Sequence, residues 1–107
     1  MTIEELLITA KENKASDVHI TVGLPPKMRI NGILLDMEYP RLLPADTEAV
    51  ISTMMNDKRL KQFEELGEID FSYSIPQIGR YRVNVFHQRG SMAASIRLVS
   101  TKIPLPE

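Results

Sequence analysis

The sequence predicts an α+β domain in which helices cover one face of a mainly antiparallel sheet. The expected order of elements is one helix, three strands, two helices and three strands. Helices are expected where apolar residues recur with helical periodicity, and strands where apolar and polar residues alternate. Links between consecutive strands are short except for the helical pair in the middle, and short links join antiparallel neighbours. With 107 residues, the chain is long enough for one domain with its own core.

The first half of the chain predicts one helix and three strands. Thr2 and Glu5 have the spacing of a capping box, and the helix that follows has an apolar face. Residues 16–22, SDVHITV, alternate apolar and polar side chains as a half-buried strand does. Residues 27–37 predict two strands around Asn31-Gly32, because both residues tolerate the positive φ of a two-residue hairpin loop. The expected apolar face of the helix is Ile3, Leu6, Leu7 and Ala10.

The second half predicts two helices and then three strands. Pro44 suits the first position of a helix, and Asn56 can cap a second helix over residues 57–66, which Gly67 ends. The apolar face of the first of these helices is expected to be Val50, Ile51, Met54 and Met55. The three strands are expected within residues 70–75, 80–88 and 92–100.

Arginines occupy the strand face opposite the apolar one. Arg80, Arg82 and Arg97 fall in the polar phase of the last strands, and Arg89 lies at the turn between two of them. Asp70 is the one acidic residue on that face of the three strands. The pattern fits either a solvated sheet face or a site for an external anion, since guanidinium groups bind phosphate and carboxylate oxygens bidentately. The expected core phase is Phe71, Tyr73, Ile75, Tyr81, Val83, Val85, Met92, Ala94, Ile96 and Leu98.

Composition and missing motifs narrow the possible functions. A net charge of −1 argues against broad affinity for nucleic acid. The sequence contains no cysteine, so disulfides and thiolate metal sites are excluded, and this composition is compatible with a cytosolic protein. The sequence contains no G-x-x-x-x-G-K-[ST] loop for phosphates, and we expect no signal peptide or membrane span. His19 and His87 lack metal-ligand spacing, so no metal site is predicted. Asp17 is expected to be a cap or turn residue ahead of the first strand.

Three stretches of the sequence resemble the N-terminal domain of the PilT family. They are KASDVHITVGLPPKMRINGIL, DFSYSI and GRYRVNVFHQRGSMAASIRLV, and the similarity is collinear along the chain. The family comprises the pilus-retraction (twitching-motility) ATPases of the type IV pilus and type II secretion superfamily. The resemblance implies a PAS-like domain over residues 1–101, with residues 102–107 starting a linker to a RecA-like ATPase domain absent from this chain. A start at Met1 with the domain itself favours the retraction type.

The resemblance also implies a role for the arginines. Family members form cytoplasmic hexameric rings at the inner-membrane platform of the pilus and hydrolyse ATP with Mg²⁺, and the N-terminal domain of one subunit packs on the RecA-like domain of its neighbour. Arg80 and Arg97 match arginines that approach the neighbour's nucleotide, and Arg82 and Arg89 match less closely.

Other consequences of the resemblance concern the interface and the isolated chain. Asp17 and His19 are candidates for an interface between domains, and the chain alone, without Walker motifs, should be inactive. A free-standing PAS-like module that binds a small ligand remains the alternative. A nucleic-acid binder is a further reading, but no nucleic-acid partner is expected, because the overall charge is acidic and Phe86 is the only aromatic residue on the basic face.

Overall fold

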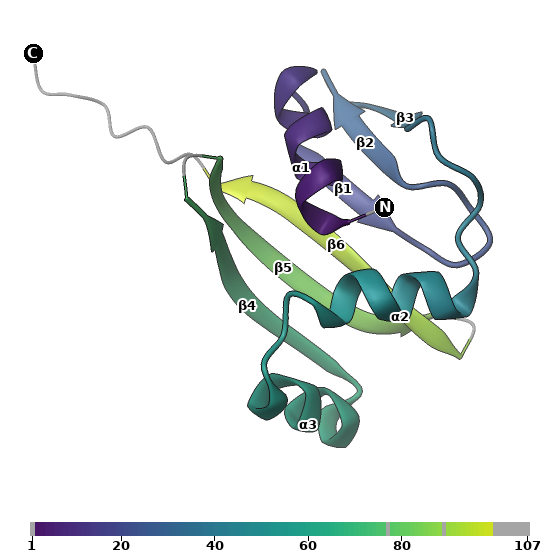
Figure 1. The fold of residues 1–107 in the computed structure, drawn as a ribbon, viewed down its shortest axis with the longest axis vertical. Coiled ribbons are helices and arrows are strands. Elements are labelled where there is room, and N and C mark those ends of the chain that lie inside the picture. Colours follow the sequence, from purple (N-terminus) through teal and green to yellow (C-terminus); the bar gives the residue numbers. More distant parts are fainter. Residues whose placement is uncertain (1, 77, 89, 100–107) are drawn as a thin grey trace, which may run out of the picture.

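The computed structural model describes residues 2–76, 78–88 and 90–99, which form three helices and six strands (Figure 1). In chain order the elements are α1 (Ile3–Glu12), β1 (Asp17–Ile20), β2 (Lys27–Ile30), β3 (Ile33–Asp36), α2 (Pro44–Ser52), α3 (Asp57–Leu66), β4 (Glu68–Ile75), β5 (Gly79–Gln88) and β6 (Ser91–Val99). Arg89 and the expected linker over residues 102–107 lie outside the described residues.

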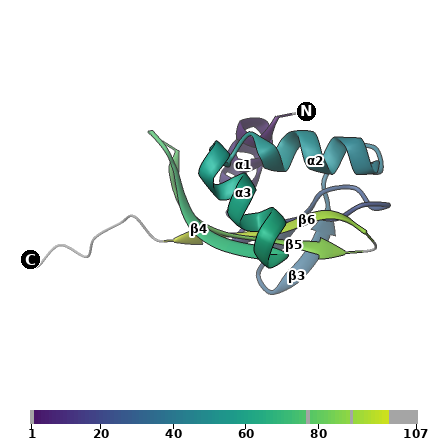
Figure 2. The same cartoon turned by 90° about the horizontal axis from the view of Figure 1, so that it is seen from below.

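All six strands belong to one sheet with the order β3-β2-β1-β6-β5-β4, and every neighbouring pair is antiparallel. Each half of the chain forms its own three-stranded meander, and β1 joins them by pairing with β6. The three helices lie on one face of this sheet (Figure 2). The expected α+β class is therefore confirmed, and the opposite face of the sheet carries no helix in the described part of the chain.

Local sequence signals explain where the elements begin and end. The capping box of α1 is present, with Thr2 Oγ1 accepting from the Glu5 amide at 3.1 Å and Glu5 Oε1 accepting from the Thr2 amide at 2.9 Å. Asn56 Oδ1 caps α3, and Gly67 ends it with a φ of 83°. Asn31 and Gly32 both have positive φ, 52° and 80°, as a two-residue hairpin loop requires.

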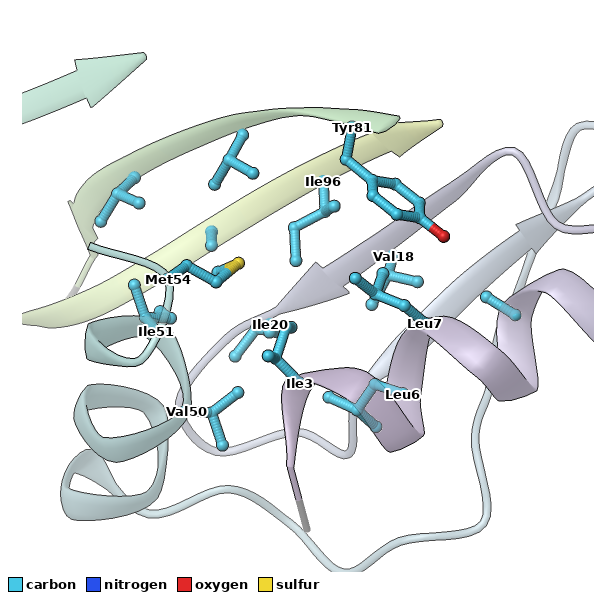
Figure 3. Close-up of a cluster of buried hydrophobic side chains, with 14 of the residues drawn as sticks. Ile3, Leu6, Leu7, Val18, Ile20, Val50, Ile51, Met54, Tyr81 and Ile96 are labelled. Atoms are coloured by element: carbon cyan, nitrogen blue, oxygen red, sulfur yellow. The ribbon is translucent and has the colours of Figure 1, made fainter. Parts of the chain in front are cut away.

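The core lies between the helices and the covered face of the sheet (Figure 3). Helix α1 contributes Leu6 and Leu7, and the two middle strands β1 and β6 contribute Ile20 and Ile96, none of them more than 1% exposed. Burial of such a side chain contributes roughly 1.5–3 kcal/mol relative to exposure. The sheet is thereby held rigidly from one side, which positions the side chains of its other face.

Several expectations for individual residues are wrong. The first strand ends at Ile20 rather than at residue 22, and α2 ends at Ser52, although Met54 and Met55 are still buried in the following turn. Leu98 is 40% exposed, although it lines a small pocket together with Leu7 and Lys11 of α1. Ala93 is buried despite its polar phase, since it is small and lies directly opposite the larger Phe86.

Candidate functional site: an arginine row on the open face of the sheet

Strand pairing places four charged residues in one line across the open face. Asp17 of β1 lies opposite Arg29 of β2 on one side and Arg97 of β6 on the other, and Arg97 lies opposite Arg82 of β5. Directly paired residues project from the same face of a sheet. We call these four residues, Arg29, Asp17, Arg97 and Arg82, the arginine row.

Arg80 belongs to the same face, two residues before Arg82 on β5 and opposite Val99 of β6. Arg80, Arg82 and Arg97 are all exposed, so the shared polar face expected from their alternation is observed.

Carboxylates compensate only part of the positive charge. Arg82 Nη2 lies 3.3 Å from Asp70 Oδ2, and Arg29 Nε lies 3.8 Å from Asp17 Oδ2. Arg80 and Arg97 form no ion pair with any residue that the structure describes. Like charges directly opposite each other in a sheet are destabilising. The Arg82–Arg97 pair is therefore a local concentration of positive charge that an anion from outside the chain would relieve.

A shallow depression lies beside this pair. It is lined by Asp70, Arg82, Asn84, Ser95 and Arg97 and has a volume of about 240 Å³. Two guanidinium groups, an amide and a hydroxyl can all donate hydrogen bonds to an oxyanion. The chemistry of this depression suits a phosphate or carboxylate group, with Asp70 already engaged by Arg82.

Asp17 is part of β1 and is 9% exposed, which corrects the expectation of a cap or turn residue. Pairing already begins one residue earlier, where the Ser16 amide donates to the Arg29 carbonyl and the Ser16 carbonyl accepts from the Leu98 amide. The strand is thus flanked on both sides from its first residue, and the Asp17 carboxylate is buried between two arginine-bearing strands.

His19 follows Asp17 on the same face and lies opposite Ser95. Its Nε2 atom is buried, has no hydrogen-bond partner among the described residues and lies 3.8 Å from Asp17 Oδ2. Burial lowers the pKa of His19 below 6.5; the Asp17 carboxylate opposes this shift, and the Arg29 guanidinium adds to it. Asp17 and His19, both candidates for an interface, are thus adjacent members of one polar face.

Arg29 was not among the candidate residues from the sequence. The alternation of Lys27, Met28, Arg29 and Ile30 could have placed it in a polar phase, with Met28 buried. Its place beside Arg97 and Arg82 depends on the pairing of β1 with both β2 and β6. No local pattern in the sequence shows that pairing.

Neither a metal site nor a membrane span is found in the part of the chain that the structure describes. Its His, Asp and Glu side chains form no group of three placed to hold a metal ion. None of its helices is long and apolar enough to cross a membrane.

Comparison with known proteins identifies relatives of the whole chain, although no family model matches the sequence. Over 103 residues, 96% of the chain, it is 40% identical to the type IV pilus retractation ATPase PilT of Pseudomonas aeruginosa. The crystal structure of the pilus retraction motor PilT with bound ADP matches 97% of the chain, with a TM-score of 0.91 and 42% identity. The chain is homologous to the N-terminal domain of PilT.

Two further ATPases match nearly the whole chain at lower identity. The type IV pilus ATPase PilU of the same organism is 36% identical over 107 residues. The ATPase DotB of Legionella pneumophila matches 97% of the chain, with a TM-score of 0.81 and 26% identity. The chain spans 30% of the length of PilT and 28% of that of PilU. The resemblance noted in the sequence is therefore confirmed for the domain.

Proposed function

We propose that the chain is the N-terminal domain of an ATPase that powers type IV pilus retraction. In this proposal Arg80 and Arg97 contact nucleotide bound to the RecA-like ATPase domain of a neighbouring subunit in a hexameric ring. The similarity to PilT, named as a retraction ATPase, supports the general role. The observation that carries the arginine assignment is that Arg97 lies opposite Arg82 on the neighbouring strand and forms no ion pair with a carboxylate of the described residues.

The arrangement suits phosphate recognition across a subunit boundary. Arginines on a rigid sheet are held in place before the nucleotide arrives, so little reorganisation accompanies contact with the phosphates. Arg80 and Arg97 are the two whose charge is not already compensated within the described residues, whereas Arg82 is paired with Asp70. We therefore assign the main contacts to Arg80 and Arg97, a smaller one to Arg82, and keep Arg89 as a further candidate.

The nucleotide itself would be held mainly by the ATPase domain. The present sequence has no G-x-x-x-x-G-K-[ST] loop, and the Mg²⁺ ion would accompany ATP in that other domain. The chain's own contribution is positive charge and N–H donors directed at the phosphates, supplied in trans. Asp17 and His19 would lie at the interface with the ATPase domain. The ring would be cytoplasmic and would act on the inner-membrane platform of the pilus.

Turnover of arginine variants tests this function. In the longer protein that carries the ATPase domain, Arg80→Ala and Arg97→Ala should each lower steady-state ATP hydrolysis about tenfold or more, as loss of an arginine finger does. The melting temperature of this domain should change little, because both side chains are exposed and no buried partner is left behind. Wild-type turnover by both variants in an intact ring would contradict the assignment, and so would a large fall in domain stability.

The alternative, a free-standing PAS-like module with a small ligand in its core, has less support. The pocket among the core residues Leu7, Val18, Tyr81 and Ile96 has a volume of only about 10 Å³. Pockets that bind small molecules are typically about 300–1,000 Å³. Titration with candidate metabolites that shifted the resonances of these core residues would favour this alternative.

A further inference from the structure

A second polar site lies on the helix-covered side of the sheet, away from the arginine row. It is a pocket of about 380 Å³ where α2 and α3 meet the ends of β5 and β6, on either side of their connecting turn. Its lining includes Glu48 and Ser52 of α2, Phe63 and Glu64 of α3, His87 of β5 and Met92 of β6. The helices lie on this side of the sheet in Figure 2.

The floor of the pocket contains a stacked pair of rings. The rings of Phe63 and His87 are nearly parallel, with centroids 4.5 Å apart and an interplanar angle of 28°. His87 Nδ1 lies 3.2 Å from the Gly67 carbonyl oxygen. Because a carbonyl oxygen only accepts, Nδ1 donates in this contact. Phe63 is 3% exposed, whereas His87 is exposed, so a ligand can reach the imidazole from solvent.

The described lining carries two carboxylates and no cation. Glu48 and Glu64 are both exposed, and neither forms an ion pair within the described residues. Among the residues that the structure describes, no lysine or arginine lines the pocket. Apolar side chains such as Leu60 and Met92 complete the wall and suit a hydrocarbon stem.

We propose that this pocket receives an arginine side chain presented by a partner polypeptide. A guanidinium is planar, so it can stack on the imidazole of His87 and still donate N–H groups in its plane to carboxylates. Glu48 and Glu64 supply two carboxylates from different helices, and the apolar wall accommodates the three methylenes of the stem. A lysine ammonium would satisfy the carboxylates but has no planar group that could stack on the ring. In this proposal the domain has two binding surfaces: the open face of the sheet is cationic, and the pocket among the helices binds a cation.

Arginine, lysine and citrulline model compounds test this proposal directly. The ¹⁵N-labelled chain is titrated with N-acetylarginine methylamide, and backbone amide shifts are followed. We expect saturable shifts centred on Glu48, Glu64 and His87, with a Kd on the order of 1 mM for so small a ligand. N-acetylcitrulline methylamide, which has the same shape without the charge, and N-acetyllysine methylamide should each bind at least fivefold more weakly.

Matched variants separate the carboxylates of the pocket from general surface charge. The double variant Glu48→Gln/Glu64→Gln should raise the Kd at least tenfold, while Glu65→Gln, on the neighbouring surface of α3 and not part of the lining, should leave it unchanged. The retained dispersion of the spectrum reports that each variant is folded. Equal binding of citrulline or lysine, an equal effect of Glu65→Gln, or the absence of saturable shifts would each overturn the proposal. None of these outcomes depends on the nucleotide role of the opposite face.

Discussion

Replacement of Asp17 by Asn tests whether burial or distance decides the strength of the ion pairs in this sheet. Asp17 lies 3.8 Å from Arg29 Nε with its side chain 10% exposed, whereas Asp70 lies 3.3 Å from Arg82 Nη2 with its side chain 52% exposed. Distance alone predicts that the Asp70 pair is stronger. Burial predicts the reverse, because water screens the exposed pair.

The magnitude follows from the geometry. At 3.8 Å and an effective dielectric constant of about 20, the Asp17–Arg29 attraction is about 4 kcal/mol. Desolvation of the carboxylate offsets part of it, and Arg29, whose side chain is 38% exposed, regains water when its partner is lost. We expect Asp17→Asn to lower the free energy of unfolding by about 1–2 kcal/mol, or the melting temperature by about 5–10 °C. Asp70→Asn should lower the free energy of unfolding by only about 0.2–1 kcal/mol.

Urea denaturation followed by circular dichroism, at low salt and at 0.5 M NaCl, measures both variants. Added salt should shrink the Asp70→Asn effect and leave most of the Asp17→Asn effect, since buried charges are screened less. If Asp70→Asn proved as destabilising as Asp17→Asn, or if salt removed both effects equally, burial would not decide the strength of these ion pairs.

Further predictions concern protonation, packing and the isolated chain. Burial lowers the pKa of His19 below 6.5, so its native state binds a proton more weakly than the unfolded chain, and stability falls as the pH drops below 6.5 towards the native pKa. The urea midpoint should therefore fall more for the wild type than for His19→Gln between about pH 7.5 and pH 5; parallel falls would contradict this. Ile96→Ala should lower the free energy of unfolding, measured with urea, by about 2–4 kcal/mol, and Leu98→Ala should lower it by less than about 1 kcal/mol. The difference is expected because Ile96 is 1% exposed and Leu98 is 40% exposed. Equal losses would mean that the end of β6 is covered in solution. The isolated chain should hydrolyse no ATP above a buffer blank and should be a monomer or weak oligomer by light scattering at micromolar concentration; turnover that survives repurification, or a tight hexamer, would defeat this expectation.

The elements could be predicted from the sequence because their boundaries depend on local chemistry. Asn31-Gly32 forms its loop, and Asn56 and Gly67 bound their helix, through contacts within a few residues. The face of Arg97 also followed from alternation. Whether an alternating residue is covered depends on another element, so Leu98 was assigned to the core although it is 40% exposed.

The composition of the arginine row could not be predicted in the same way. Asp17 and Arg97 lie near opposite ends of the chain and meet only because β1 pairs with β6. From the sequence alone, where that pairing is not visible, Asp17 had the features of a turn residue and Arg29 was assigned to a separate hairpin. The sequence therefore predicted which arginines share a face, but not the buried carboxylate that lies among them.

Activity of mixed rings tests the central claim, that the arginines act on the nucleotide of a neighbouring subunit. One subunit type carries Arg97→Ala with an intact phosphate loop and should alone keep about a tenth of wild-type turnover or less. The other carries an inactive phosphate loop with Arg97 intact and should be inactive alone. If Arg97 acts in trans, an equal mixture restores function at about a quarter of the interfaces, and turnover should rise to about that fraction of the wild-type rate. A mixture that assembles into rings but stays as inactive as its two components would contradict the account.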